Sequence, residues 1–246
     1  MQLTLGPALG VAVAVCALTA ALVTRLGMLG HSRAVLTAVG RAALQLAAVS
    51  LIVGAVIASL PLTVLFLAVM TAVAGRTAGG RISPDRRWAW ALLPVCGGTT
   101  PLLAGLAAAG VVPLRGIALI PIGGILIGGA MTATTLAGRR ALDELRSRHG
   151  ELDAGLAVGL DSRQAALLVC RQRAADALIP ALDQTRSVGL VTLPGAFVGM
   201  LLGGASPVQA GAVQLLVLAG LLAVQALAVL ITVELVAAGR FAQIPV

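Results

Sequence analysis

Residues 210–237 read AGAVQLLVLAGLLAVQALAVLITVELVA, and Glu234 is the only charged residue among them. A helix needs about 20 mostly apolar residues to cross the hydrocarbon core of a bilayer. An apolar stretch of 10 to 14 residues is also found in water-soluble cores, but a stretch of this length is typical of a transmembrane helix. The segment therefore predicts a chain that is embedded in a membrane.

The rest of the sequence repeats this pattern. Hydrophobic residues make up 59% of the 246 residues and charged residues 11%, whereas soluble domains carry about 25% charged residues. We predict an all-α, polytopic integral membrane protein with about seven transmembrane helices. The third is short, so a re-entrant segment is an alternative there. The expected spans are Leu5–Val23, Val39–Ala58, Leu60–Gly75, Trp88–Gly110, Gly116–Ala137, Val188–Gly204 and Ala210–Ala237.

The arginines indicate how the chain is threaded through the membrane. All 17 basic residues are arginine, and the net charge is +8. If the N-terminus lies outside, Arg115 is the one arginine on the outer side, and the others lie in or next to inner loops. This is the positive-inside distribution, and it predicts a cytosolic C-terminus. Because residues 1–7 carry no positively charged side chain, the first span is expected to be retained and not cleaved as a signal peptide.

The composition also excludes several functions. The chain has two Trp, three Phe and no Tyr, which leaves no platform for stacking bases, so no nucleic-acid partner is expected. It has no Lys and cannot carry the lysine of an ordinary phosphate-binding P-loop. We expect no cofactor on this chain, and any ATP and Mg that drive it are bound by a partner subunit. Cys16, Cys96 and Cys170 form no Cys-x-x-Cys pair, and no metal-binding residues can be assigned.

One long polar stretch, residues 138–187, separates the spans. We expect a single transmembrane domain over residues 1–246, with residues 138–187 as a cytosolic helical loop. Residues 139–148 are expected to extend the fifth helix. Asp161 can cap a further helix, with Gln164 as its capping-box partner. A loop of this length that contains its own helices is usually functional.

Glycines recur at helical spacing in two spans. Gly195, Gly199 and Gly203, which follow Pro194, share one face of the sixth span, and Gly124 and Gly128 share a face of the fifth. Glycine at this spacing lets two helix backbones approach closely. Two interpretations remain: tight packing within one subunit, or a face that slides or lines the pathway between two copies.

The fourth span contains two prolines, Pro94 and Pro101, with Gly97 and Gly98 between them. A helix broken at this point would expose backbone carbonyl groups, as at the binding sites of many transporters. The alternative is a tolerated proline kink, which neighbouring helices satisfy.

Few polar side chains are expected within the membrane. Gln45 lies one turn from Arg41 on the second span, and Glu234 lies near the inner end of the last. A buried ionisable or amide group in a bilayer is costly and is a candidate for function. The candidate pathway residues for a substrate are Gln45, Met131, Thr132, Met200 and Glu234.

Several longer motifs occur along the chain, and together they resemble those of one family, the FetB-like ABC permeases. The resemblance implies an inner-membrane permease that pairs with a separate ATPase subunit. Members of the family are linked to iron export and oxidative-stress resistance, and plant relatives to aluminium tolerance and nucleotide-sugar transport. The motifs are Arg41-Ala-Ala-Leu-Gln-Leu46, Ile127-Gly-Gly-Ala-Met-Thr-Ala-Thr134, Ala177-Leu-Ile-Pro-Ala-Leu182, Val188-Gly-Leu-Val-Thr-Leu-Pro-Gly195 and Gly203-Gly-Ala-Ser-Pro-Val-Gln-Ala210.

The long loop resembles the Glu-Ala-Ala…Gly loop of ABC permeases, in which a short helix and a glycine turn dock on the ATPase. The resemblance assigns this coupling role to Glu151, Asp153, Ala154, Gly155, Gly159 and Ala165. An amphipathic surface helix without a partner is the alternative. The sequence departs from the family at Asp153 and Gly155, at Gly129, where Asn is usual, and at Ala196–Met200, where Met-Met-Thr-Gly-Gln is usual.

We therefore expect the permease subunit of an ABC transporter that exports iron or another metal ion across the bacterial inner membrane. The expected partners are an ATP-binding subunit, a second copy of the chain and the lipid bilayer. The alternative function is a secondary transporter or channel that is not coupled to an ATPase. The sequence does not name the substrate or the direction of transport.

Overall fold

The computed structural model describes residues 6–83 and 86–242. The start of the first predicted span, Leu5, and the end of the C-terminal tail lie outside this part. In the described residues the secondary structure is helical, with one isolated bridge between Val188 and Thr192. The chain divides into two units, residues 1–56 and residues 57–246, and each is described by itself.

The first unit is a helical hairpin. Helix α1 (Pro7–Leu26) begins with a proline at its first position, where the missing N–H costs nothing. Helix α2 (Ser32–Ala58) follows after a turn in which Met28 and Gly30 have positive φ. Large apolar side chains of both helices are exposed, such as Leu18 (61%) and Leu51 (87%). Such surfaces are suited to lipid or to a protein partner, since water would not tolerate so many of them.

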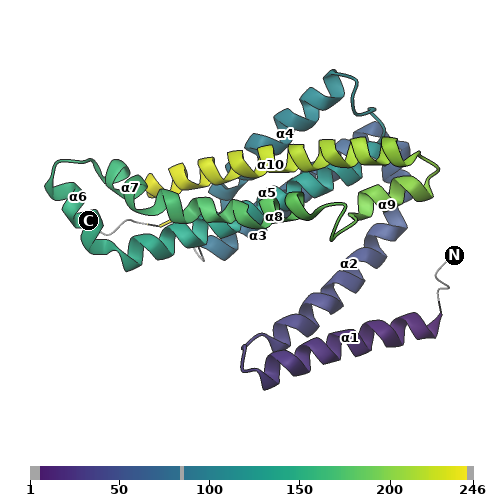
Figure 1. Ribbon diagram of the computed structural model, residues 1–246, viewed down its shortest axis with the longest axis horizontal. Coiled ribbons are helices and arrows are strands. Elements are labelled where there is room, and N and C mark those ends of the chain that lie inside the picture. The colour runs from purple at the N-terminus through teal and green to yellow at the C-terminus, as the bar shows by residue number, and fades with distance from the viewer. Residues whose placement is uncertain (1–5, 84–85, 243–246) are drawn as a thin grey trace. The chain divides into compact units, whose positions relative to one another are not determined.

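The second unit holds the remaining helices (Figure 1). Its two longest are α5 (Gly116–Ser147) and α10 (Pro207–Ala237), and α5 extends past the apolar residues as the sequence predicts. The shorter elements are α3 (Leu60–Ile82), η1 (Arg86–Ala91), α4 (Leu92–Ala108), α6 (His149–Ala157), α7 (Ser162–Ala175), η2 (Asp176–Leu178), α8 (Ile179–Ser187) and α9 (Gly195–Leu202).

Small residues hold the core of this unit together. Ala130 on α5 and Ala228 on α10 are completely buried. A Cβ added to Gly98 of α4 would lie 3.1 Å from the Val224 Cα of α10, so glycine lets the two backbones approach closely here. Lipid provides no hydrophobic force between apolar helices, and close backbone contact between small residues is what stabilises them in a bilayer.

Six described helices are long and apolar enough to cross a membrane, where the sequence predicted about seven spans. The all-α, polytopic fold is confirmed. The third of these helices, α3, has 23 residues and is longer than the predicted Leu60–Gly75, so it does not need a re-entrant path.

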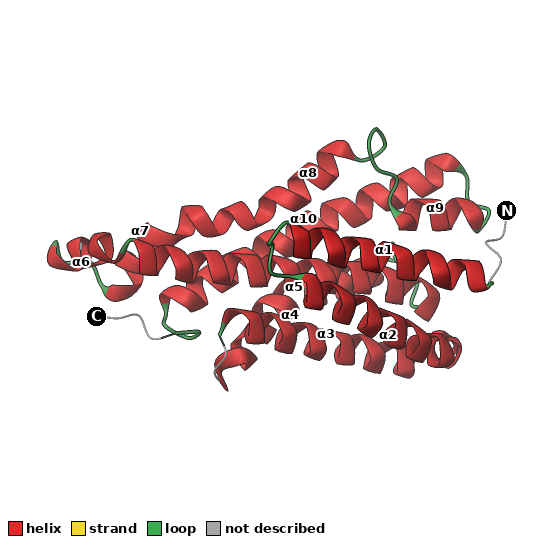
Figure 2. Ribbon diagram, turned by 90° about the horizontal axis from the view of Figure 1, so that it is seen from below, coloured by secondary structure: helices red, strands yellow, loops and turns green. Residues whose placement is uncertain are grey.

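The predicted span Val188–Gly204 is wrong as a single helix. Helix α9 has only 8 residues, about 12 Å against a hydrocarbon core of about 30 Å. Gly189 has a φ of 84°, and Pro194 disfavours a helical conformation at the residue before it. Residues 188–194 therefore form a loop, and α7, α8 and α9 follow one another as a broken segment alongside α10 (Figure 2).

Of the two interpretations of Pro94–Pro101, the structure supports the tolerated proline and not the broken helix. Helix α4 is continuous from Leu92 to Ala108, with Pro101 inside it. Pro94 lies in the first turn, where the N–H groups have no acceptor within the helix. The alternative, a tolerated proline, is the one that the structure supports.

Arginine and tryptophan side chains meet at one end of this unit. The Arg76 guanidinium lies 5.2 Å from the centre of the Trp88 ring, and that of Arg240 lies 4.8 Å from the Trp90 ring. Arg87 donates to the Gly239 carbonyl oxygen at 3.2 Å. These contacts tie the end of α3, η1 and the residues after α10 to the same end of the bundle, which is where an arginine-rich side is predicted.

Candidate functional site

The loop between α5 and α10 begins with a helical hairpin made of α6 and α7. The two helices are joined by a turn at Gly159, which has a φ of 92°. The Asp161 carboxylate accepts from the Gln164 backbone N–H at 2.7 Å, and the Gln164 side chain accepts from the Asp161 N–H at 3.1 Å. This is the predicted capping box. The local sequence therefore fixes both the turn and the start of α7.

Two of the predicted coupling residues close the hairpin. Gly155 and Ala165 are both buried, and a Cβ added to Gly155 would lie 3.2 Å from the Ala165 Cβ. Leu152, 1% exposed, packs into the same core as Ala165. The two helices of the hairpin are thus packed against each other through small and apolar side chains that continue into the core of the second unit.

The acidic residues of α6 pair with basic residues at its own N-terminal end. Glu151 forms an ion pair with Arg148, whose second carboxylate partner is Glu144 on α5. Asp153 lies 3.0 Å from the His149 ring nitrogen Nδ1. Acidic groups near a helix N-terminus also interact favourably with the helix dipole. These pairs leave the exposed Ala154 and the turn as the free tip of the hairpin.

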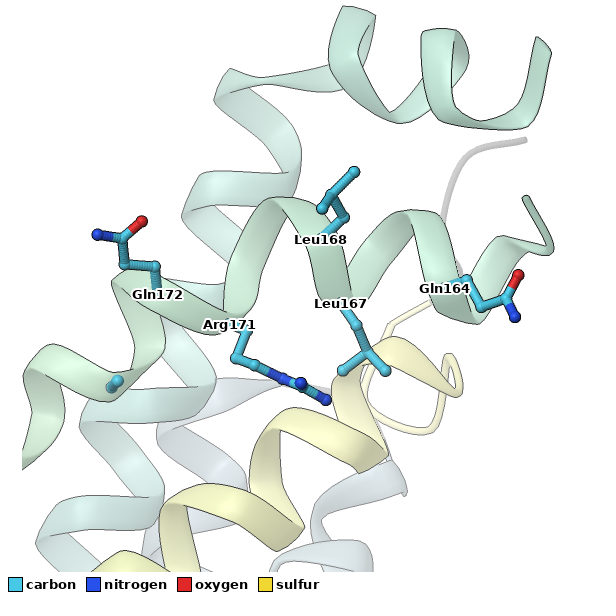
Figure 3. Close-up of a pocket in the computed structure, with 6 residues that line it drawn as sticks. Gln164, Leu167, Leu168, Arg171 and Gln172 are labelled. Atoms are coloured by element: carbon cyan, nitrogen blue, oxygen red, sulfur yellow. The ribbon is translucent and has the colours of Figure 1, made fainter. Parts of the chain in front are cut away.

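An exposed groove of about 510 Å³ runs along α7. It is lined by Gln164, Leu167, Leu168, Arg171, Gln172 and Ala175. Figure 3 shows Leu167 and Arg171 directed toward α10, with Leu168 on the other side of the helix. Leu168 is 73% exposed, and Val158 beside the turn is 80% exposed. Both side chains are therefore available for contact with a partner protein.

Glu234 fastens this hairpin to the last long helix. Its Oε2 accepts from Arg163 Nη2 at 2.5 Å and its Oε1 from Arg171 Nη2 at 3.5 Å. Arg163 and Arg171 lie two turns apart on the same side of α7. The structure thus places Glu234 at the junction between α7 and α10, and the pocket described next does not include it.

A second pocket, of about 300 Å³, lies between α5, α8 and α10. Its polar groups are Thr132, Gln184 and Gln225, and Gly128 and Gly129 form part of its wall. Thr132 was predicted as a pathway residue and Gly128 as a packing or pathway residue. Gln184 and Gln225 were not predicted, although an amide within an apolar run such as that around Gln225 is the signal that could have found it.

The other predicted pathway residues lie elsewhere. Met131 is partly buried against the core, Met200 is partly buried on α9, and Gln45 is exposed on α2 in the first unit. Gly124, predicted as a packing or pathway residue, lies next to Met70: a Cβ added to Gly124 would be 3.3 Å from the Met70 Cε.

The described residues contain no group of three His, Cys, Asp or Glu side chains that could hold a metal ion.

The predicted glycine face on α9 is open. Within the described part of the second unit, no atom lies within 4 Å of a Cβ built at Gly195 or Gly199. Gly203 ends the helix, where an added Cβ would meet only carbonyl oxygens of α9 itself, at 3.4 Å. Pro194 is the residue before the first turn of this helix. The face is therefore available to another helix.

Comparisons with known proteins place this architecture in a family. Residues 7–241 match the model of the uncharacterised protein family UPF0014. The UPF0014 membrane protein STAR2 of Oryza sativa is 33% identical over 217 residues, which cover 87% of this chain and 75% of that protein. The protein ALUMINUM SENSITIVE 3 of Arabidopsis thaliana is 37% identical over 150 residues, 61% of this chain and 55% of that protein.

A bacterial relative carries a functional name. The "Probable iron export permease protein FetB" of Escherichia coli is 33% identical over 129 residues, 52% of this chain and 50% of that protein. No solved structure matches the chain. The family match covers nearly the whole chain and includes the hairpin, the pocket and the broken α8–α9 segment, and the chain therefore belongs to the UPF0014 family of membrane proteins.

Proposed function

We propose that this chain is the permease subunit of an ATP-driven transporter in the bacterial inner membrane. A separate ATP-binding subunit, which holds ATP and Mg, binds the α6–α7 hairpin, and two copies of the permease form the pathway. The transported substrate is iron or another metal ion. The name of the FetB relative supports permease function and iron as the substrate.

The observation that carries the proposal is the link between the hairpin and α10. The hairpin has a buried core, an exposed apolar side chain at Val158 near its tip and a charged connection from Arg163 and Arg171 to Glu234. A partner that pushes on the tip would displace α7, and the ion pairs would carry that displacement to α10. A secondary transporter needs no such lever, because its energy comes from an ion gradient.

Reconstitution tests this function directly. The full-length chain is placed in proteoliposomes together with a candidate ATP-binding-cassette subunit from the same genome, and movement of radioactive Fe²⁺ is followed with and without ATP. We expect movement that requires ATP and stops when the ATPase is inactivated. Movement that ignores ATP and follows a proton or sodium gradient would assign the chain to the secondary transporters instead.

Labelling of single cysteines tests the proposed orientation. In a background without Cys16 and Cys96, Arg81→Cys is expected to react with a membrane-impermeant maleimide only in inside-out vesicles, and Arg115→Cys only in intact cells. The native Cys170 should stay unlabelled, because it is completely buried and burial raises the pKa of its thiol to about 11. Labelling of Arg81→Cys from outside contradicts the orientation.

The open glycine face tests the proposed dimer. Gly199→Leu adds a large side chain where two α9 helices would meet and is expected to raise the dimer dissociation constant in detergent by about tenfold, equivalent to about 1.4 kcal/mol. Gly105→Leu is the matched control, since Gly105 is also helical with nothing within 4 Å of an added Cβ. Equal dimer fractions in both variants and the wild type, measured by light scattering, exclude this face as the dimer contact.

A further inference from the structure

The pocket between α5, α8 and α10 contains a buried polar side chain without a partner. Gln225 is 8% exposed and lines the pocket. Its amide offers one acceptor and two donors, and neither amide atom forms a hydrogen bond with any described residue. The amide is therefore free to form hydrogen bonds with whatever occupies the space beside it.

Two more polar groups border the same space. The Thr132 hydroxyl donates to the Gly128 carbonyl oxygen at 3.0 Å, so its oxygen can still accept a hydrogen bond from the pocket. Gln184 is exposed on α8 and supplies a second amide. The polar lining therefore consists of neutral hydrogen-bonding groups, and the remaining lining residues are apolar or glycine: Ile125, Gly128, Gly129, Leu136, Ala177, Pro180, Ala181 and Leu221.

Gly129 is the reason that Gln225 can reach this position. A Cβ added to Gly129 would lie 2.8 Å from Gln225 Nε2 and would collide with the Leu221 side chain. A side chain at position 129 would therefore require the Gln225 amide and the Leu221 side chain to shift. The glycine at position 129, where the family usually has Asn, thus makes room for the Gln225 amide at the pocket wall.

The lining indicates how a solute would be held. A bare divalent cation takes roughly six to eight oxygen ligands, usually with carboxylates among them, and no acidic side chain lines this pocket. A pocket of about 300 Å³ has the volume of about ten water molecules at about 30 Å³ each. That is room for a cation that keeps its first shell of water, or for a small polyol.

We propose that this pocket is the solute-binding site of the proposed transporter, where Gln225, Thr132 and Gln184 hydrogen-bond to the hydroxyl groups or metal-bound water molecules of the solute. The role of the pocket in transport rests on the proposed function, whereas binding of a solute to the pocket can be tested without it. Gln225 is the residue that contributes most, because it is the buried one and its amide has no partner in the empty pocket.

Binding to the permease alone is the first test. The purified full-length chain is titrated with Fe²⁺, with hexaamminecobalt(III), which mimics a hydrated cation, and with sorbitol. We expect one of these probes to bind, and Gln225→Leu to weaken its affinity by about tenfold, the amount expected for one lost hydrogen bond. Competition between Fe²⁺ and hexaamminecobalt(III) identifies a hydrated cation as the ligand, and binding of sorbitol identifies a hydroxylated one.

Gln214→Leu is the matched control. Gln214 is an equally buried glutamine on α10 whose Oε1 has no partner, but it does not line the pocket. We expect Gln214→Leu to bind as the wild type does and Gln225→Asn to recover part of the loss. Unchanged binding in Gln225→Leu overturns the site, and so does a wild type that binds none of the probes.

Transport in proteoliposomes with the ATP-binding subunit separates the two proposals. Loss of probe movement in Gln225→Leu, with ATP hydrolysis retained, supports the site. Binding that depends on Gln225 without any ATP-driven movement in the wild type leaves the site in place and contradicts the proposed function. Normal ATP-driven movement in Gln225→Leu contradicts the site and leaves the function in place.

Discussion

Reversing the charge at Glu234 is expected to abolish ATP-driven transport while the protein still reaches the membrane. The carboxylate connects α10 to Arg163 and Arg171, and its side chain is 31% exposed. Glu234→Arg would place three arginines together and push α7 away from α10. Partly exposed pairs contribute only about 0–1 kcal/mol to stability, so folding should survive. The loss falls on the transmission of movement, and we expect transport below about one tenth of the wild-type rate, which is a change of about 1.4 kcal/mol.

A second substitution can restore this connection. In the double variant Glu234→Arg with Arg163→Glu, the charges are exchanged and the pair can form again. We expect recovery of a substantial part of the transport, because the coupling energy in such a cycle belongs to the pair and not to either residue. Asp143→Arg is the control, since Asp143 pairs with Arg146 within α5 alone. No recovery in the double variant, or an equal loss in the control, argues against the connection.

Replacing Gly159 with Val is expected to have a similarly large effect by a different route. The residue has a φ of 92° and nothing lies within 4 Å of an added Cβ, so the effect comes from the backbone and not from a clash with other residues. A non-glycine residue with positive φ costs about 1–2 kcal/mol, and more if it is β-branched. The hairpin should rearrange at its tip, where the ATPase is proposed to bind.

The measurement is copurification of the ATP-binding subunit together with transport. For Gly159→Val we expect normal membrane levels, at least tenfold weaker binding of the subunit and lost transport. Gly150→Val is the matched control, because Gly150 lies in α6 of the same hairpin, has no positive φ and also has open space around it. Full affinity and full transport in Gly159→Val would remove the hairpin from the coupling mechanism.

Structural features that depend on residues close together in the sequence could be predicted from the sequence. The long apolar runs gave the all-α membrane fold, since hydrocarbon tolerates only backbone that is hydrogen-bonded within itself. The extension of α5, the glycine turn and the capping box of Asp161 and Gln164 were also correct. Each is decided by interactions over a few residues, which a sequence displays directly.

The errors concern where the backbone breaks. Hydropathy counted Val188–Gly204 as a span because its side chains are apolar, but Gly189 and Pro194 interrupt the helix. The prolines at 94 and 101 left a broken helix and a tolerated kink both open, and α4 is continuous. The proline in the first turn lacks a hydrogen bond that would be absent anyway, whereas Pro101 is exposed and lies inside a helix that continues through it. Composition cannot distinguish these cases.

The sequence by itself determined which segments are helical and how the hairpin turns, because those depend on short-range hydrogen bonds and on burial in lipid. Only the tertiary structure decided which polar groups meet. Arg163 and Glu234 are 71 positions apart, and Gln225 on α10 lies against Gly129 on α5. Such contacts depend on which face each helix turns to its neighbours, and small-residue packing over the whole bundle sets that rotation.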